Sequence, residues 1–107
     1  MKLKITGRHM EVTPALKNYV ETRFGRLDRY GLKVGVLQII LGVEKLQHKG
    51  EVTGSVSGKR VQAKITTPEM YATIDALVDR VDAQFRKLKE RLVSHKPEKP
   101  KRKTVVS

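Results

Sequence analysis

The amino-acid sequence predicts an α+β domain, a two-layer βαβββα sandwich in which two helices cover one face of a four-stranded sheet. The length of 107 residues suits a single core. Apolar residues alternate with polar ones in four segments and recur at helical spacing in two others, in the order strand, helix, three strands, helix. Since each segment has one apolar face, both helices must pack on the same side of the sheet.

The first strand and the first helix are indicated by the first 30 residues. Residues 1–7 alternate apolar and polar side chains and end at Gly7, which predicts a strand with one buried face. Thr13 followed by Pro14 is typical of a helix cap with proline in the first turn, and we expect a helix over residues 13–30. Its apolar positions are Leu16, Val20, Phe24 and Leu27.

Three strands should follow Gly31, which we expect to end the first helix. Residues 37–44 alternate, with Ile40 as an apolar side chain on the outer face. Residues 47–50 suggest a polar hairpin loop before a third strand of about eight residues, and residues 57–59 a tight turn into the fourth. These strands should form an antiparallel meander. The residues expected to face inward are Leu37, Ile39, Leu41, Val43, Val52, Gly54, Val56, Val61, Ala63 and Ile65.

The second helix has the longest regular pattern. Thr66 and Glu69 have capping-box spacing, Pro68 lies at the start, and the apolar period then continues for more than six turns of about 3.6 residues. Residues 94–107 have no such period and are rich in lysine and proline, so we expect a folded domain over 1–93 and a disordered basic tail. The apolar positions are Met70, Ile74, Leu77, Val78, Val81, Phe85, Leu88 and Leu92.

The charge balance favours a polyanionic partner. The chain has 23 lysines and arginines against 11 acidic residues, a formal net charge of +12. Residues 1–93 hold 18 of the basic and 10 of the acidic residues, so the domain itself is basic. Nucleic acid is therefore favoured over the alternative of a charge that serves only solubility. A membrane surface is less favoured, because neither helix joins a basic side to an exposed apolar face.

No pattern indicates an enzyme, a metal site or a cofactor. The chain has no cysteine, and its histidines, His9, His48 and His95, fall in an expected turn, loop and tail without ligand spacing. Asp75 and Asp79 lie one helical turn apart, but such a pair is usually only solvated. No apolar segment approaches the roughly 18 residues of a membrane span. We expect a non-enzymatic cytoplasmic protein that is monomeric in isolation.

Basic residues should form a surface along the two helices. On the second helix, Arg80, Lys87 and Arg91 share one flank with Gln84, which interrupts the basic run; three aspartates, Asp75, Asp79 and Asp82, occupy the opposite flank. The first helix carries Arg23, Arg26 and Arg29 near its end. If the helices pack side by side, the two basic sets could line one groove; the alternative is a solvated helix face.

Such a groove would bind phosphates and riboses of folded RNA and would read few bases. Each neutralised phosphate should steepen the salt dependence of binding by roughly 0.7 to 0.9 in slope. Aromatic residues for base stacking are few, and Phe24 and Phe85 fall at core positions. Tyr30, near the basic end of the first helix, is the one reasonable stacking residue.

Several segments carry a family resemblance. The most specific is Glu69 to Asp75, sequence EMYATID, followed by Asp79-Arg80. With these segments the chain resembles the ribosome hibernation-promoting factor family, also called ribosome-associated inhibitor or sigma-54 modulation proteins. The shorter matches are Ile5-Thr6-Gly7, Thr13 with Ala15-Leu16, Arg23-Phe24 with Arg26-Leu27, and Val43-Glu44-Lys45.

The resemblance implies a domain in the cleft between head and body of the small ribosomal subunit, over the messenger and transfer-RNA positions. A protein at this place would block translation sterically, in stationary phase or under stress. Family members use basic residues of both helices to contact ribosomal RNA. The matching positions are Arg23, Arg26, Arg80, Lys87 and Arg91, with Lys89 as a further candidate.

The resemblance also implies a short form, which in the family acts with ribosome modulation factor to pair idle ribosomes. Some relatives instead carry a C-terminal extension and keep ribosomes as inactive monomers; the lysine-rich residues 96–107 differ from that type and favour pairing. A general double-stranded RNA-binding module is a second hypothesis, because the fold resembles that domain topologically. Control of transcription is a third, suggested by the older family name.

Overall fold

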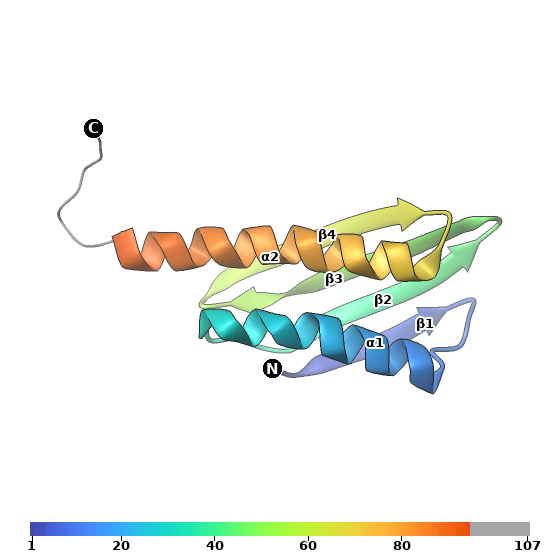
Figure 1. Cartoon of the computed structure of the whole chain (residues 1–107), viewed down its shortest axis with the longest axis horizontal. Coiled ribbons are helices and arrows are strands. Elements are labelled where there is room, and N and C mark those ends of the chain that lie inside the picture. The colour runs from blue at the N-terminus through green and yellow to red at the C-terminus, as the bar shows by residue number, and fades with distance from the viewer. Residues whose placement is uncertain (95–107) are drawn as a thin grey trace.

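The computed structural model describes residues 1–94 and has the predicted order of elements, as Figure 1 shows. The predicted tail from residue 95 onward lies outside the described residues, and the last helix includes Ser94. The elements are β1 (Leu3–Arg8), α1 (Pro14–Gly25), the 3-10 helix η1 (Arg26–Tyr30), β2 (Leu37–Glu44), β3 (Gln47–Val56), β4 (Lys59–Thr67) and α2 (Met70–Ser94).

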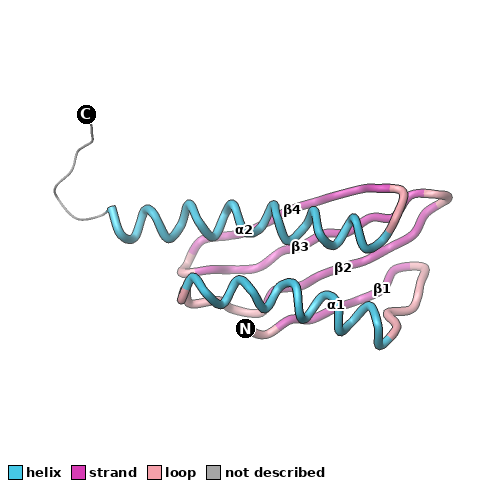
Figure 2. Tube along the Cα trace, in the orientation of Figure 1, coloured by secondary structure: helices cyan, strands magenta, loops and turns pink. Residues whose placement is uncertain are grey.

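The strands form one sheet in the order β1-β2-β3-β4. β1 runs parallel to β2, and β2, β3 and β4 form the predicted antiparallel meander. Both helices cover the same face of the sheet and lie side by side, while no helix formed by residues 1–94 covers the other face (Figure 1 and Figure 2). The expected two-layer sandwich is therefore confirmed.

The first helix begins as predicted and ends earlier than predicted. The Thr13 hydroxyl accepts a hydrogen bond from the Leu16 amide at 3.2 Å, and Pro14 occupies the first turn. The α-helical part stops at Gly25, and η1 continues to Tyr30 in the tighter 3-10 form. The predicted α-helix over residues 13–30 is wrong in its last turn, although Gly31 ends the segment in a left-handed conformation with φ 65°.

The loop predicted at residues 47–50 is wrong, because these residues belong to β3. The β2–β3 connection is the two-residue turn Lys45–Leu46, in which Lys45 has φ 56° and Leu46 is 89% exposed. The turn contains no glycine, asparagine or aspartate, the residues that usually accept positive φ, so no local signal marked it. β3 is consequently ten residues long.

The capping box predicted from Thr66 and Glu69 is also wrong. Thr66 pairs with Lys49 in the sheet, and the Glu69 carboxylate itself accepts hydrogen bonds from the amides of Tyr71 and Ala72 at 2.9 and 3.0 Å. A negative side chain at this end also suits the positive end of the helix dipole. Glu69 thus caps α2.

The core lies between the helices and the sheet. Phe24 and Phe85 are its largest side chains, and both are fully buried. α2 continues beyond the sheet (Figure 1), so Leu92 is 57% exposed although it keeps the apolar period. The other buried apolar residues are Leu16, Val20, Leu27, Leu37, Ile39, Leu41, Val52, Val56, Val61, Ala63, Met70, Ile74, Leu77 and Val81.

Two glycines of β3 let neighbouring side chains approach the sheet. A Cβ on Gly54 would lie 2.5 Å from Leu37 Cδ2, so the missing side chain leaves room for Leu37. A Cβ on Gly50 would lie 2.5 Å from Leu77 Cδ1 and 3.0 Å from Thr73 Cγ2, both on α2. The absence of a side chain at Gly50 therefore sets how closely α2 packs on β3.

Gly50→Ala should lower the free energy of unfolding by about 1–3 kcal/mol, because the added methyl overpacks the contact with α2. Urea denaturation followed by circular dichroism would measure the change. Gly25→Ala is the control, because a Cβ there meets no atom within 4 Å and the φ of −59° is helical. It should be stabilising by about 0.4–1 kcal/mol. Equal stabilities for the two variants would contradict the packing described.

Candidate nucleic-acid interface

The position of Gln84 shows which way α2 is turned. Its amide nitrogen donates to the Gln62 carbonyl at 2.8 Å, and its carbonyl accepts from the Gln62 amide at 3.3 Å, so it faces the outer strand β4. Residues three, four and seven apart share one face of a helix. The exposed side chains of Arg80, Lys87 and Arg91 therefore lie on the β4 side of α2, and we call these three residues the basic flank.

The acidic flank of α2 faces α1 and η1. Asp75 Oδ1 accepts hydrogen bonds from Arg23 Nε at 2.9 Å and from the Tyr19 hydroxyl at 2.7 Å, and its distance to Arg23 Nη2 is 2.8 Å. Asp82 Oδ1 accepts from Arg29 Nη2 at 2.6 Å and from the Tyr30 hydroxyl at 2.9 Å. Two arginine–tyrosine–aspartate clusters thus join the helices.

The expectation that both basic sets line one groove is wrong. Arg23 and Arg29 point at the aspartates of α2, whereas the basic flank lies on the other side of the helix. The physical reason is charge pairing, because opposite charges at a helix junction attract and like charges there would repel. The cations form two separate ridges with an acidic strip between them.

The ridge next to α1 contains more cations than the first helix alone supplies. Arg26 is exposed and close enough to Asp75 for its charge to act on that carboxylate. Arg86 and Lys89 follow Asp82 by four and seven residues, so they share its flank, and Arg86 Nη1 lies 3.9 Å from Asp82 Oδ2. The sequence reasoning missed Arg86, although its i,i+4 spacing from Asp82 was visible.

The Asp75 cluster shifts the proton affinities of its members. Burial raises the pKa of Asp75, but the hydrogen bonds from Tyr19 and Arg23 and the nearby positive charges outweigh it and hold the pKa below its ordinary value. The hydrogen bond to Asp75 in turn raises the pKa of Tyr19 and that of Arg23. The cluster is therefore a carboxylate that holds a guanidinium in a fixed position at neutral pH.

Aromatic side chains at this surface are already engaged. The Tyr30 ring is half-buried, lies against Phe85 and is covered by the Arg29 guanidinium at 4.8 Å, so the predicted stacking residue has a partner within the chain. Tyr71, which the sequence reasoning passed over, packs edge-on against Tyr19 at 4.7 Å and is 39% exposed. The surface is better suited to phosphate contacts than to base stacking.

Other kinds of site find no support in the part of the chain that the structure describes. Within residues 1–94, no three histidine, cysteine, aspartate or glutamate side chains gather as metal ligands. No helix in that range has the length and apolarity needed to cross a bilayer. The candidate site therefore consists of exposed ammonium and guanidinium groups, which can donate hydrogen bonds to phosphate oxygens.

Comparisons with known proteins relate the chain to ribosome-associated proteins. The family described as Sigma 54 modulation protein / S30EA ribosomal protein matches residues 3–93. A ribosome hibernation promoting factor from Salmonella typhimurium is 36% identical over 95 residues, which cover 89% of this chain and 100% of that protein. A protein with the same name from Azotobacter vinelandii is 42% identical over 93 residues, 87% of each chain.

Solved structures show the same fold. The N-terminal domain of Thermus thermophilus Protein Y superimposes with a TM-score of 0.78 at 30% identity, over 82% of this chain and 99% of that one. A ribosomal subunit interface protein from Coxiella burnetii gives a TM-score of 0.74 over 84% and 99% of the two chains, and at 23% identity it supports the fold alone.

Asp75→Asn should reduce the loss of stability in acid. Because the pKa of Asp75 is lowered in the folded state, its ionised carboxylate contributes its full stabilisation when the pH is above the unfolded-state pKa of about 3.9. This contribution is lost as the pH falls through the folded-state pKa. The variant should be less stable than the parent at neutral pH and should lose less stability below about pH 4. Thermal unfolding across this pH range would measure both effects.

Asp79→Asn is the matched control for that measurement. Asp79 is exposed on the same helix and takes part in none of the ion pairs among residues 1–94. Its replacement removes the same charge from α2 without breaking an ion pair, so any difference between the two variants belongs to the Asp75 cluster. Identical acid profiles for Asp75→Asn and the parent would show that the cluster does not stabilise the fold.

Proposed function

Because the chain belongs to the family described as Sigma 54 modulation protein / S30EA ribosomal protein, we propose that it binds the small ribosomal subunit between head and body. There it covers the messenger and transfer-RNA positions and keeps idle ribosomes from translating. The family and the relatives named ribosome hibernation promoting factor support a non-enzymatic, ribosome-associated role in hibernation. A ribosome-bound role supports a cytoplasmic location as part of this proposal.

The observation that carries this proposal is the separation of charge on α2. Arg80, Lys87 and Arg91 are exposed on one flank, and the aspartates are turned to the opposite flank, where Asp75 and Asp82 pair with arginines. A phosphate backbone that approaches the basic flank therefore meets none of the three aspartates of α2, and the exposed carboxylate nearest to it along the helix is Glu90, three residues after Lys87. Cations that have no paired carboxylate neutralise phosphates most effectively.

The ridge next to α1 supplies the second set of proposed contacts. Asp75 binds Arg23 through Nε and Nη2 and Asp82 binds Arg29 through Nη2. An arginine held in this way loses little conformational entropy when it binds, because its side chain is already ordered. The proposed RNA-binding residues are Arg23, Arg26, Arg29, Arg80, Lys87, Lys89 and Arg91.

Recognition on this basis would depend on RNA shape. Two rigid ridges of cations fit a surface whose phosphates are spaced to match, and they contact riboses and phosphates rather than base edges. A general double-stranded RNA-binding module is the second candidate function, and the basic flank alone is compatible with it. Binding to intact small subunits that far exceeds binding to an arbitrary duplex at equal salt would favour the ribosomal role.

Simultaneous change of Arg80, Lys87 and Arg91 to glutamate should abolish co-sedimentation with small subunits and leave the fold intact. All three side chains are exposed, so the core is unaffected, and three reversed charges repel the phosphates they would neutralise. Circular dichroism would verify folding. The double variant Lys87→Glu/Arg91→Glu should already weaken binding strongly.

Lys17→Glu/Lys45→Glu is the control for the double variant, because it changes the net charge by the same amount at exposed positions outside both ridges. It should sediment with the subunit nearly as well as the parent. If the triple variant still co-sediments with small subunits, the basic flank has no part in binding.

We further propose that the bound chain favours pairing of ribosomes, together with ribosome modulation factor. The relatives from Salmonella and Azotobacter are named hibernation promoting factors, and the chain covers 100% and 87% of their lengths. Sucrose-gradient sedimentation of ribosomes from starved cells should show a dimer peak that is larger with this chain than without it. A gradient in which the chain instead increases inactive monomers would assign it to the inhibitor type.

A further inference from the structure

The sheet face turned away from the helices, here called the open face, is mostly polar. Strand residues alternate between the core and this face, and Lys4, Gln38, Thr53 and Gln62 form one row across all four strands. The other three residues of this row carry short hydroxyl or amide groups that can donate hydrogen bonds. Two further rows are Thr6, Ile40, Glu51 and Lys64, and Arg8, Gly42, Lys49 and Thr66.

The open face has an excess of positive charge. Its two carboxylates are already paired, Glu44 with Lys49 at 2.7 Å and Glu51 with Lys64 at 3.1 Å. The Lys49 ammonium holds the pKa of Glu44 below its ordinary value, so this pair stays charged at neutral pH. The remaining cations are Lys4, Arg8 and Arg60, which are exposed and take part in none of the ion pairs among residues 1–94.

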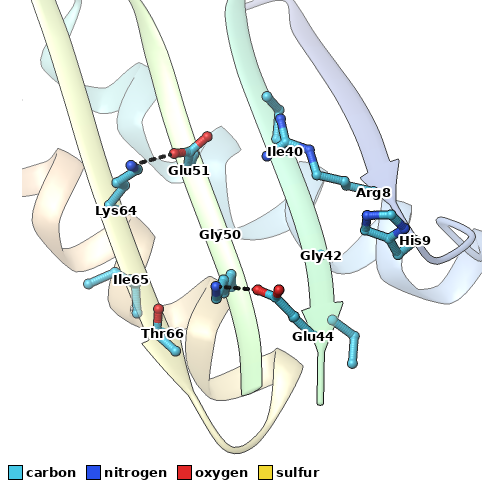
Figure 3. Close-up of a pocket in the computed structure, with 12 residues that line it drawn as sticks. Arg8, His9, Ile40, Gly42, Glu44, Gly50, Glu51, Lys64, Ile65 and Thr66 are labelled. Atoms are coloured by element: carbon cyan, nitrogen blue, oxygen red, sulfur yellow. Dashed lines mark hydrogen bonds and ion pairs between the residues drawn. The ribbon is translucent and has the colours of Figure 1, made fainter. Parts of the chain in front are cut away.

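A shallow hollow of about 470 Å³ lies on this face beside the end of β1. Figure 3 shows it from the side opposite the helices, with the Lys64–Glu51 pair on one side, Arg8 and His9 on the other, and Glu44 between them. Gly42 has no side chain to fill the space next to Arg8, with which it pairs in the sheet. A phosphate backbone can therefore enter the hollow between these charged side chains.

We infer that the open face is a second RNA-backbone-binding surface, so that the domain is held between two RNA segments, one at the helices and one at the sheet. This inference rests on the proposed binding to ribosomal RNA and extends it to the opposite side of the molecule. The shortest dimension of the Cα trace is 19 Å, and the two surfaces lie on opposite sides of the two layers. One RNA strand cannot line both, so two segments are required.

A phosphate backbone fits this face better than a protein partner does. Stable protein interfaces have a core of aromatic or large apolar side chains. The apolar side chains here are the half-buried Ile40, Val36 at one end, and the half-buried Val43 and Ile65 at the lining of the hollow. Cations with neighbouring hydroxyl and amide donors are typical of contacts to phosphate and ribose. No aromatic side chain is present in the rows of the open face for base stacking.

Lysine acetylation in the presence and absence of small ribosomal subunits, read out by mass spectrometry, tests the inference on the whole chain. We expect several-fold lower acetylation of Lys4 as well as of Lys87 in the complex, with Lys45 at the β2–β3 turn unchanged. Protection of Lys87 without protection of Lys4 would overturn the second surface and leave the proposed function standing. Protection of neither lysine would remove the proposed function itself.

A zero-length amine-to-carboxylate cross-linker separates RNA from protein as the partner. The phosphodiesters within an RNA chain do not couple to amines with this reagent, so a Lys4 that is protected by RNA should yield no cross-link in the complex. A cross-link from Lys4 to a carboxylate of a ribosomal protein would show that this face docks on protein, and would overturn the inference.

Neutralisation of the open face should change the salt dependence of binding. For Lys4→Gln/Arg8→Gln, the slope of log affinity against log salt should fall by about 1.4 to 1.8, the contribution of two phosphates. The control Lys17→Gln/Lys45→Gln removes the same charge elsewhere and should keep the parental slope. Equal slopes for the two double variants would show that Lys4 and Arg8 do not contact RNA.

Discussion

Burial of the apolar side of α2 against the sheet fixes the rotation of that helix about its own axis, and the surface of the domain follows from it. Ile74, Leu77 and Phe85 are fully buried, so the residues about a quarter-turn to either side must point along the sheet in opposite directions. One direction leads to α1 and the other to the outer strand β4. The hydrophobic effect therefore decides which charges of α2 meet α1 and which meet solvent.

The charges of the helices are organised by the same constraint. Aspartates that face α1 neutralise the arginines there, and the two tyrosines add hydrogen bonds to the carboxylates. The cationic character of the helical side consequently depends on Arg26 and on the flank near β4 more than the sequence suggests. A count of charge along one helix cannot show this, because it ignores what the neighbouring helix presents.

Sequence periodicity was sufficient for the element order, the core and the shared face of the two helices. It failed where tertiary contacts override local signals. Lys45 adopts positive φ in the turn because the two long strands beside it pair, and Glu69 rather than Thr66 accepts hydrogen bonds from the amides of α2. The basic residues of α2 were correctly placed on one flank, but the direction of that flank was not predictable. Periodicity gives angles within a helix and gives no angle between helices.

Gln84, which interrupts the basic flank, has a separate consequence through its two hydrogen bonds to Gln62. Its side-chain amide satisfies one N–H and one C=O of the outermost strand in the way that a fifth strand would. An extended segment, for example from another copy, therefore cannot pair with edge strand β4 at this position. Gln84, which interrupts the run of positive charge, thus also disfavours aggregation through intermolecular strand pairing at β4.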